Sequence, residues 1–210
     1  MTKVIAITGC MGSGKTTLVH HLRQLIPGSA VLFEDHFQTM TQMDLAELDQ
    51  WKDRGSSIGE LNLNGFDRAI REALGASGNL RAKEPKLLPP KLLIIESQFG
   101  RAHPSLADLV DYQIWIDAPL DLCLARKILQ LLSIDPGDSN GPMSPVEIRG
   151  LCTLYLESTA RLLREQIRQV ASVSDATLVN DKNTARMVDE ALQIVANRAS
   201  GSLGLDGDWL

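Results

Sequence analysis

Short apolar runs recur along the chain, and the stretches between them are long enough to hold a helix. The runs are nearly continuous rather than alternating, which is typical of strands buried on both faces of a parallel sheet. Five strands are predicted, at residues 4–7, 30–33, 92–95, 114–116 and 176–179. Helical patterns separate them, so we expect a three-layer α/β/α fold in which helices cover a central parallel sheet.

The longest helical pattern begins at residue 144. Ser144-Pro145-Val146-Glu147 combines a capping box with proline at the first helical position. Apolar residues then follow at helical spacing and predict a face packed into the core. These residues are Ile148, Leu151, Cys152, Tyr155, Leu162, Leu163 and Val170. A last helix is predicted from about Thr184, with Met187, Val188, Ala191, Leu192 and Val195 facing inward.

The pattern favours one domain rather than two. The 210 residues, 44% of them apolar, are enough for a single α/β core. We expect this domain at residues 1–199, with a loop at 133–143 that holds two prolines, two glycines and two aspartates. A Gly- and Asp-rich tail, residues 200–210, is predicted to be flexible.

The amino-acid composition limits the kinds of partner that the protein can bind. A net charge of −5 and only 4% aromatic residues argue against the binding of nucleic acid. The three cysteines are scattered, with no C-x-x-C, which suits a reducing cytoplasm. No export leader is visible, and no apolar run approaches the roughly 20 residues that cross a bilayer. We therefore predict a cytoplasmic protein without a membrane partner; the oligomeric state stays open, a homo-oligomer included.

A phosphate-binding loop follows the first strand directly. Residues 9–16 read Gly-Cys-Met-Gly-Ser-Gly-Lys-Thr, a full match to G-x-x-x-x-G-K-[ST], and a helix is predicted at 17–25. Such a loop curls so that its backbone amides and the helix N-terminus face phosphate oxygens. Lys15 is expected to reach the β- and γ-phosphates of ATP and the Thr16 hydroxyl to bind Mg²⁺. The predicted ATP-binding residues are Gly9, Met11, Gly12, Ser13, Gly14, Lys15, Thr16 and Thr17.

Carboxylates follow the second and third predicted strands. Asp35 comes after residues 30–33, and Glu96 ends the run at 92–95. In parallel α/β sheets ligands gather at the carboxyl ends of the strands, so both side chains are expected beside the phosphate loop. A single acidic residue at such a position is more often a helix cap or a solvated loop residue. Two acidic residues beside a phosphate loop favour a role in catalysis or metal binding. We assign Asp35 to the proton of an attacking hydroxyl and Glu96 to Mg²⁺.

Three further residues have narrower interpretations. Cys10 has no base beside it in sequence and is interpreted as a residue that fills the loop. Asp117, after the fourth strand, is expected to cap the next helix. That helix carries Arg126 and leads into the loop at 133–143, so residues 120–150 are predicted to form a small lid. Arg126 would then stabilise charge on the phosphoryl group in transit.

With these residues in place, the chain resembles the uridine kinase and nicotinamide riboside kinase group of phosphate-loop kinases. The features that carry the resemblance are the phosphate loop, Glu34-Asp35-His36-Phe37, the strand ending in Glu96, and Ile114-Trp115-Ile116-Asp117 followed by Leu124-Ala125-Arg126-Lys127. It implies the phosphate-loop kinase fold with a helical lid, ATP and Mg²⁺ as cofactors, and Asp35 as the base. It also implies that Trp51 and the segment at 65–67 belong to the acceptor-binding insertion. The predicted acceptor-binding residues are Asp35, Phe37, Asp67 and Arg101.

The sequence predicts a kinase that phosphorylates a hydroxyl of a nucleoside-like molecule, of the uridine, cytidine or nicotinamide riboside type. One departure from the group is in the lid, which usually carries several arginines, whereas here Arg126 and Lys127 are followed by Gln130. A kinase for a non-nucleoside alcohol, such as a vitamin precursor or a sugar, stays open. A nucleotide-hydrolysing switch is the rival from another class; against it, residues 96–100 lack D-x-x-G and residues 180–183 are not N-K-x-D.

Overall fold

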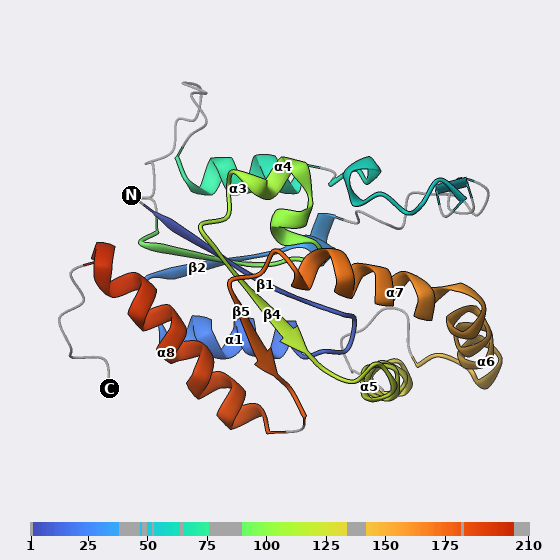
Figure 1. Ribbon diagram of the computed structural model, residues 1–210. Helices are drawn as coiled ribbons and strands as arrows, with labels where there is room; N and C mark the ends of the chain where they lie inside the picture. The colour runs from blue at the N-terminus through green and yellow to red at the C-terminus, as the bar shows by residue number, and fades with distance from the viewer. Residues whose placement is uncertain are drawn as a thin grey trace.

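The computed structural model describes residues 2–37, 47, 50–51, 53–63, 65–75, 90–133, 142–181 and 183–203, with side chains to residue 198. Five parallel strands form one sheet in the order β2-β3-β1-β4-β5 (Figure 1). Their bounds are β1 Lys3–Gly9, β2 Ser29–Phe33, β3 Leu92–Glu96, β4 Tyr112–Asp117 and β5 Ala176–Val179. All five predicted strands are confirmed, and so is the α/β class.

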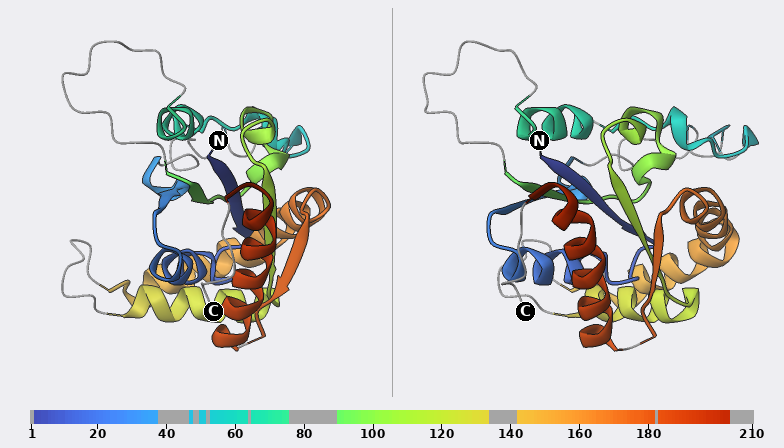
Figure 2. Two further views of the ribbon diagram at one scale, coloured as in Figure 1. Left: turned by 90° about the vertical axis from the view of Figure 1, so that its left-hand side faces the viewer. Right: turned by 60° about the vertical axis from the view of Figure 1, so that its left-hand side comes forward.

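Alternate residues of β1 enter two separate cores, one on each face of the sheet. Val4 and Ala6 belong to a cluster with Phe66 of α3 (Phe66–Ala73) and Leu106 of α4 (Pro104–Ala107). Ile5 and Ile7 belong to a cluster formed with α1 (Lys15–Leu25) and α8 (Thr184–Leu203). Helices therefore cover both faces of the sheet, which explains why its strands read as unbroken apolar runs (Figure 2).

The inward face predicted for α8 is confirmed. Met187, Val188, Ala191 and Val195 are buried, and Leu192 packs against them. The helix runs to Leu203, past the predicted start of the tail at residue 200, and residues 204–210 lie outside the described part of the chain. Of the helices in the described ranges, none is both long and apolar enough to span a membrane. The cytoplasmic location stays a prediction.

The long helical run from residue 145 is built from α6 (Pro145–Leu154) and α7 (Ala160–Gln166), each followed by a π-helical turn, Tyr155–Thr159 and Ile167–Ala171. The capping box is present: the Ser144 hydroxyl accepts from the Glu147 amide, and the Glu147 carboxylate accepts from the Ser144 amide at 2.8 Å.

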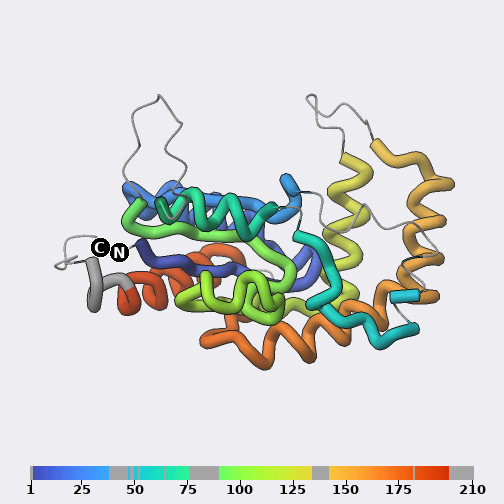
Figure 3. The backbone as a smooth tube through the Cα atoms, turned by 90° about the horizontal axis from the view of Figure 1, so that it is seen from above, coloured from blue at the N-terminus to red at the C-terminus, as the bar shows by residue number. Residues whose placement is uncertain are grey.

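The inward face predicted for this run is confirmed from Tyr155 onward. Leu163 and Val170 are buried, and Tyr155 and Leu162 pack against the same cluster. α6 buries none of its residues, so the core assignment of Ile148, Leu151 and Cys152 was wrong. The reason is position: α6 and α5 (Leu120–Leu132) extend beyond the carboxyl ends of the strands (Figure 3). The capping role of Asp117 was also wrong, because α5 has Pro119 at its N-cap and no side-chain cap.

Candidate active site at the carboxyl edge of the sheet

The phosphate loop connects the end of β1 to the start of α1, as the motif predicts. Gly12 and Gly14 have φ angles of +74° and +102°, which residues with a side chain rarely adopt. A Cβ on Gly12 would lie 2.3 Å from the carbonyl oxygen of Cys123, the buried cysteine of α5. The loop therefore needs glycine here both for its backbone conformation and for the close packing of α5.

Lys15 is held inside the loop. Its side chain is buried, and its ammonium donates to the carbonyl oxygens of Gly9 and Cys10, each at 3.1 Å. Cys10 itself is 2% exposed, and burial together with the neighbouring Cys123 raises the pKa of the Cys10 thiol to about 12. A thiol with so high a pKa is a poor nucleophile, which fits the interpretation of Cys10 as a loop-filling residue.

Thr16 and Glu96 meet although 80 positions separate them in sequence. The Thr16 hydroxyl donates to Glu96 Oε1 at 2.9 Å. Glu96 is 6% exposed, and burial raises the pKa of its carboxyl group, opposed by the charge of Lys15 and the Thr16 hydrogen bond and reinforced by the charge of Asp35. The structure thus places Thr16 in contact with Glu96, with Lys15 and Asp35 near enough for their charges to act on the Glu96 carboxylate.

Asp35 lies in a 3₁₀ turn, Glu34–Phe37, at the end of β2, and its side chain is exposed. Its neighbour Glu34 is 2% exposed and accepts hydrogen bonds from the Ser97 hydroxyl and from the Gln98 amide at 3.0 Å. Glu34 therefore ties the end of β2 to the segment after β3. The tie fixes where Asp35 lies relative to Glu96.

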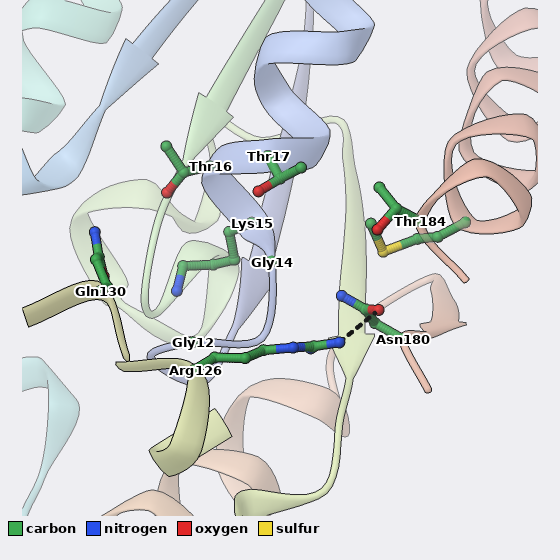
Figure 4. A pocket seen from close by; sticks show the side chains of 10 residues that line it. Gly12, Gly14, Lys15, Thr16, Thr17, Arg126, Gln130, Asn180 and Thr184 are labelled. Atoms are coloured by element: carbon green, nitrogen blue, oxygen red, sulfur yellow. Dashed lines mark hydrogen bonds between the residues drawn. The ribbon is translucent and has the colours of Figure 1, made fainter. Parts of the chain in front are cut away.

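A cleft of about 350 Å³ opens over the phosphate loop (Figure 4). Its lining comes from the phosphate loop and α1, from α5, from the residue after β5 and from the first turn of α8. The lining residues are Gly12, Gly14, Lys15, Thr16, Thr17, Arg126, Gln130, Asn180, Thr184 and Met187. Arg126 extends from α5 across the loop and donates to Asn180 Oδ1 at 3.3 Å. The predicted lid residue thus lies beside the phosphate loop.

The predicted acceptor-binding residues do not all gather in one place. The rings of Phe37 and Phe66 are 5.3 Å apart, and Asp67 follows Phe66 in the first turn of α3. Trp51 is buried in the same cluster, and its indole donates to the Ser57 carbonyl.

Arg101 lies elsewhere. Its guanidinium pairs with Asp175 and donates to the Val173 carbonyl, just before the amino end of β5. Asp175 precedes β5, which β1 and β4 separate from β3 and its Glu96, and the assignment of Arg101 to acceptor binding stays a prediction. Its ion pair instead ties the segment after β3 to the residues that enter β5.

Sequence reasoning missed three residues of the cleft, Asn180, Thr184 and Gln130, and the role of Glu34. Asn180 directly follows a predicted strand, the same signal that selected Asp35 and Glu96, and could have been found by it. Glu34 could not, because its partners Ser97 and Gln98 lie more than 60 residues away in sequence.

The comparisons with known proteins agree with the fold. The model of the phosphoribulokinase / uridine kinase family matches residues 65–130. Uridine kinase from Borrelia hermsii (strain HS1 / DAH) is 26% identical over 137 residues, which are 61% of this chain and 66% of that protein. Uridine kinase from Haemophilus ducreyi (strain 35000HP / ATCC 700724) is 26% identical over 141 residues, 60% of this chain and 65% of that protein. The match thus spans just under two thirds of each relative.

Among solved structures, that of TT1252 from Thermus thermophilus superimposes with a TM-score of 0.53 at 17% identity, over 94% of this chain and 97% of that chain. At this identity the likeness shows the fold alone. The chain is therefore similar to the phosphoribulokinase / uridine kinase family over residues 65–130, and it has a three-layer α/β/α fold with a phosphate loop after its first strand.

Proposed function

We propose that this protein is an ATP-dependent kinase that transfers the γ-phosphate to a hydroxyl of a small nucleoside-like molecule. The observation that carries the proposal is the contact between Thr16 and Glu96 beside Lys15, with Asp35 near enough for its charge to act on Glu96. A phosphate-binding loop and two carboxylates thus share one edge of the sheet. The relatives named uridine kinase favour a nucleoside-like acceptor.

The donor half of the site rests on the loop and on α5. The Lys15 ammonium and the loop amides are the groups that bind β- and γ-phosphates, and Arg126 adds a second positive charge across the loop. These cations stabilise the charge that spreads over the phosphoryl oxygens during transfer. The cleft above the loop is large enough for a small ligand.

Mg²⁺, which such kinases use, fits the residues present. Mg²⁺ prefers oxygen ligands, and the Thr16 hydroxyl and the Glu96 carboxylate place two of them in contact at the mouth of the loop. When bound, the ion neutralises phosphate charge. The phosphates of ATP and water molecules would supply the remaining ligands.

The acceptor half begins at Asp35. Its exposed carboxylate can accept the proton of an incoming hydroxyl, and Glu34 holds the turn that carries it. Phe37 offers an aromatic face backed by Phe66, and Asp67 offers a carboxylate that can accept from sugar hydroxyls. A base and a ribose supply the groups that such a set would bind.

The proposal is tested by ATP consumption with a panel of acceptors: uridine, cytidine, nicotinamide riboside, simple sugars and vitamin-like alcohols. We expect turnover that requires a nucleoside-like acceptor. Lys15→Ala should lower it by roughly 10²-fold or more with unchanged circular dichroism. Lys3→Ala, which removes only an exposed pair with Asp111, is the matched control and should leave turnover unchanged.

Two results would contradict the proposal. Turnover that is equally fast with no acceptor would indicate a nucleotide-hydrolysing switch. Near-normal phosphate transfer by Lys15→Ala would mean that the phosphate loop does not act on the donor.

A further inference from the structure

Asn180 stands where the sheet meets the phosphate loop. It follows β5 directly, and its backbone amide donates to the Asp117 carbonyl at 2.8 Å, so the β4–β5 pairing continues through it. Its side chain is 3% exposed and lines the cleft (Figure 4). A buried carboxamide needs hydrogen-bond partners, and among the described residues both side-chain partners of Asn180 belong to the site.

The first partner is the phosphate loop. Asn180 Nδ2 donates to the Ser13 carbonyl oxygen at 2.7 Å. In a trans peptide the carbonyl and the next amide point in opposite directions, so a carbonyl held toward Asn180 turns the Gly14 amide the other way. A Cβ on Gly14 would lie 2.5 Å from Asn180 Nδ2, so the carboxamide occupies the space that a side chain there would need.

The second partner is the lid helix. Arg126 Nη2 donates to Asn180 Oδ1 at 3.3 Å, while Arg126 Nη1 is buried with no hydrogen-bond partner among the described residues. Only one orientation of the carboxamide satisfies both the Ser13 carbonyl and the Arg126 guanidinium. The guanidinium is thereby held across the loop.

We propose that Asn180 is a positioning residue for phosphoryl transfer: its one carboxamide orients both the Ser13–Gly14 peptide of the phosphate loop and the guanidinium of Arg126. The inference rests on the proposed kinase function. The two contacts have separable consequences. Orienting the loop peptide contributes to ATP binding, and orienting Arg126 contributes to the rate of transfer, because the developing phosphoryl charge is what that cation stabilises.

The test is a double-mutant cycle between Asn180→Ala and Arg126→Ala, with the Kd of ATP·Mg²⁺ and the kcat for the best acceptor measured in each variant. Asn180→Ala should weaken ATP binding by about 2- to 13-fold, the worth of one hydrogen bond. It should also lower kcat by roughly 10-fold or more. In the Arg126→Ala background the effect on kcat should disappear, while the effect on Kd should persist.

Two further variants separate positioning from folding. Asn183→Ala makes the same change three residues later. The Asn183 side chain caps α8 by accepting a hydrogen bond from the Arg186 amide. This variant should therefore alter thermal stability but change neither the Kd of ATP·Mg²⁺ nor kcat. Asn180→Asp keeps the size of the side chain but removes the donor to Ser13, so it should weaken ATP binding even if Asn180→Ala folds poorly.

An Asn180→Asp variant that binds ATP like the wild type overturns the proposed role in the loop. An effect of Asn180→Ala on kcat that is equally large with and without Arg126 overturns the coupling to the lid helix. Both outcomes leave the kinase function intact. A wild-type chain that binds no nucleotide overturns the function and this inference together.

Discussion

Asp35→Asn is the change that most directly tests the chemistry assigned to this site. It keeps the size of the side chain and its hydrogen-bonding capacity but removes the proton acceptor. General-base assistance is typically worth roughly 10²- to 10⁴-fold in rate. Asp35 is exposed, so water can partly replace it, and we expect the lower part of that range, about 10²- to 10³-fold. At 1.36 kcal/mol per tenfold, this is about 2.7 to 4.1 kcal/mol of transition-state stabilisation.

The structure adds a second signature for the same variant. The charge of Asp35 contributes to the raised pKa of Glu96, so removing it should lower that pKa. If Glu96 must be ionised for activity, the acid limb of the pH–rate profile should move to lower pH in Asp35→Asn. ATP affinity should change little, because the loop around Lys15 supplies that binding.

The assay titrates ATP binding and acceptor-dependent turnover in the same preparation over a range of pH. Asp108→Asn makes the same chemical change at the exposed end of α4, before β4, and should match the wild type. A normal rate in Asp35→Asn would refute the assignment of the base. Loss of ATP affinity and turnover in parallel would mean that Asp35 serves the metal, with Glu96 the better candidate for the base.

Three other outcomes are expected. Glu96→Gln should abolish most turnover yet raise the melting temperature at neutral pH, because the folded state holds Glu96 at a raised pKa and its charge opposes folding. That gain should vanish as the pH falls below the ordinary pKa of glutamate; a lower melting temperature at pH 7 would contradict this. A thiol reagent should modify only the half-exposed Cys152 in the native protein, because burial raises the pKa of Cys10 and Cys123. Labelling of all three cysteines would contradict this expectation. Arg126→Ala should lower kcat by roughly 10²-fold and weaken ATP binding less, and a steady kcat would place the lid cation elsewhere.

The class of fold and the position of the phosphate loop can be predicted from the amino-acid sequence, because both depend on local patterns. Strands that are buried on both faces must be apolar without interruption, so each one is visible as a run. The glycines of the phosphate loop are required by the backbone conformation of Gly12 and Gly14 themselves. The capping box at Ser144 is likewise complete within four residues.

Which distant groups meet at the site depends on the folded arrangement of the strands. Thr16 and Glu96 are 80 positions apart, and Asn180 reaches the Ser13 carbonyl across 167. These contacts exist because the strand order places β3 on one side of β1, and β4 followed by β5 on the other. Apolar periodicity specifies that a strand is buried but not which strands are its neighbours. For the same reason the sequence could not show that Arg101, after β3, pairs with Asp175, which precedes β5.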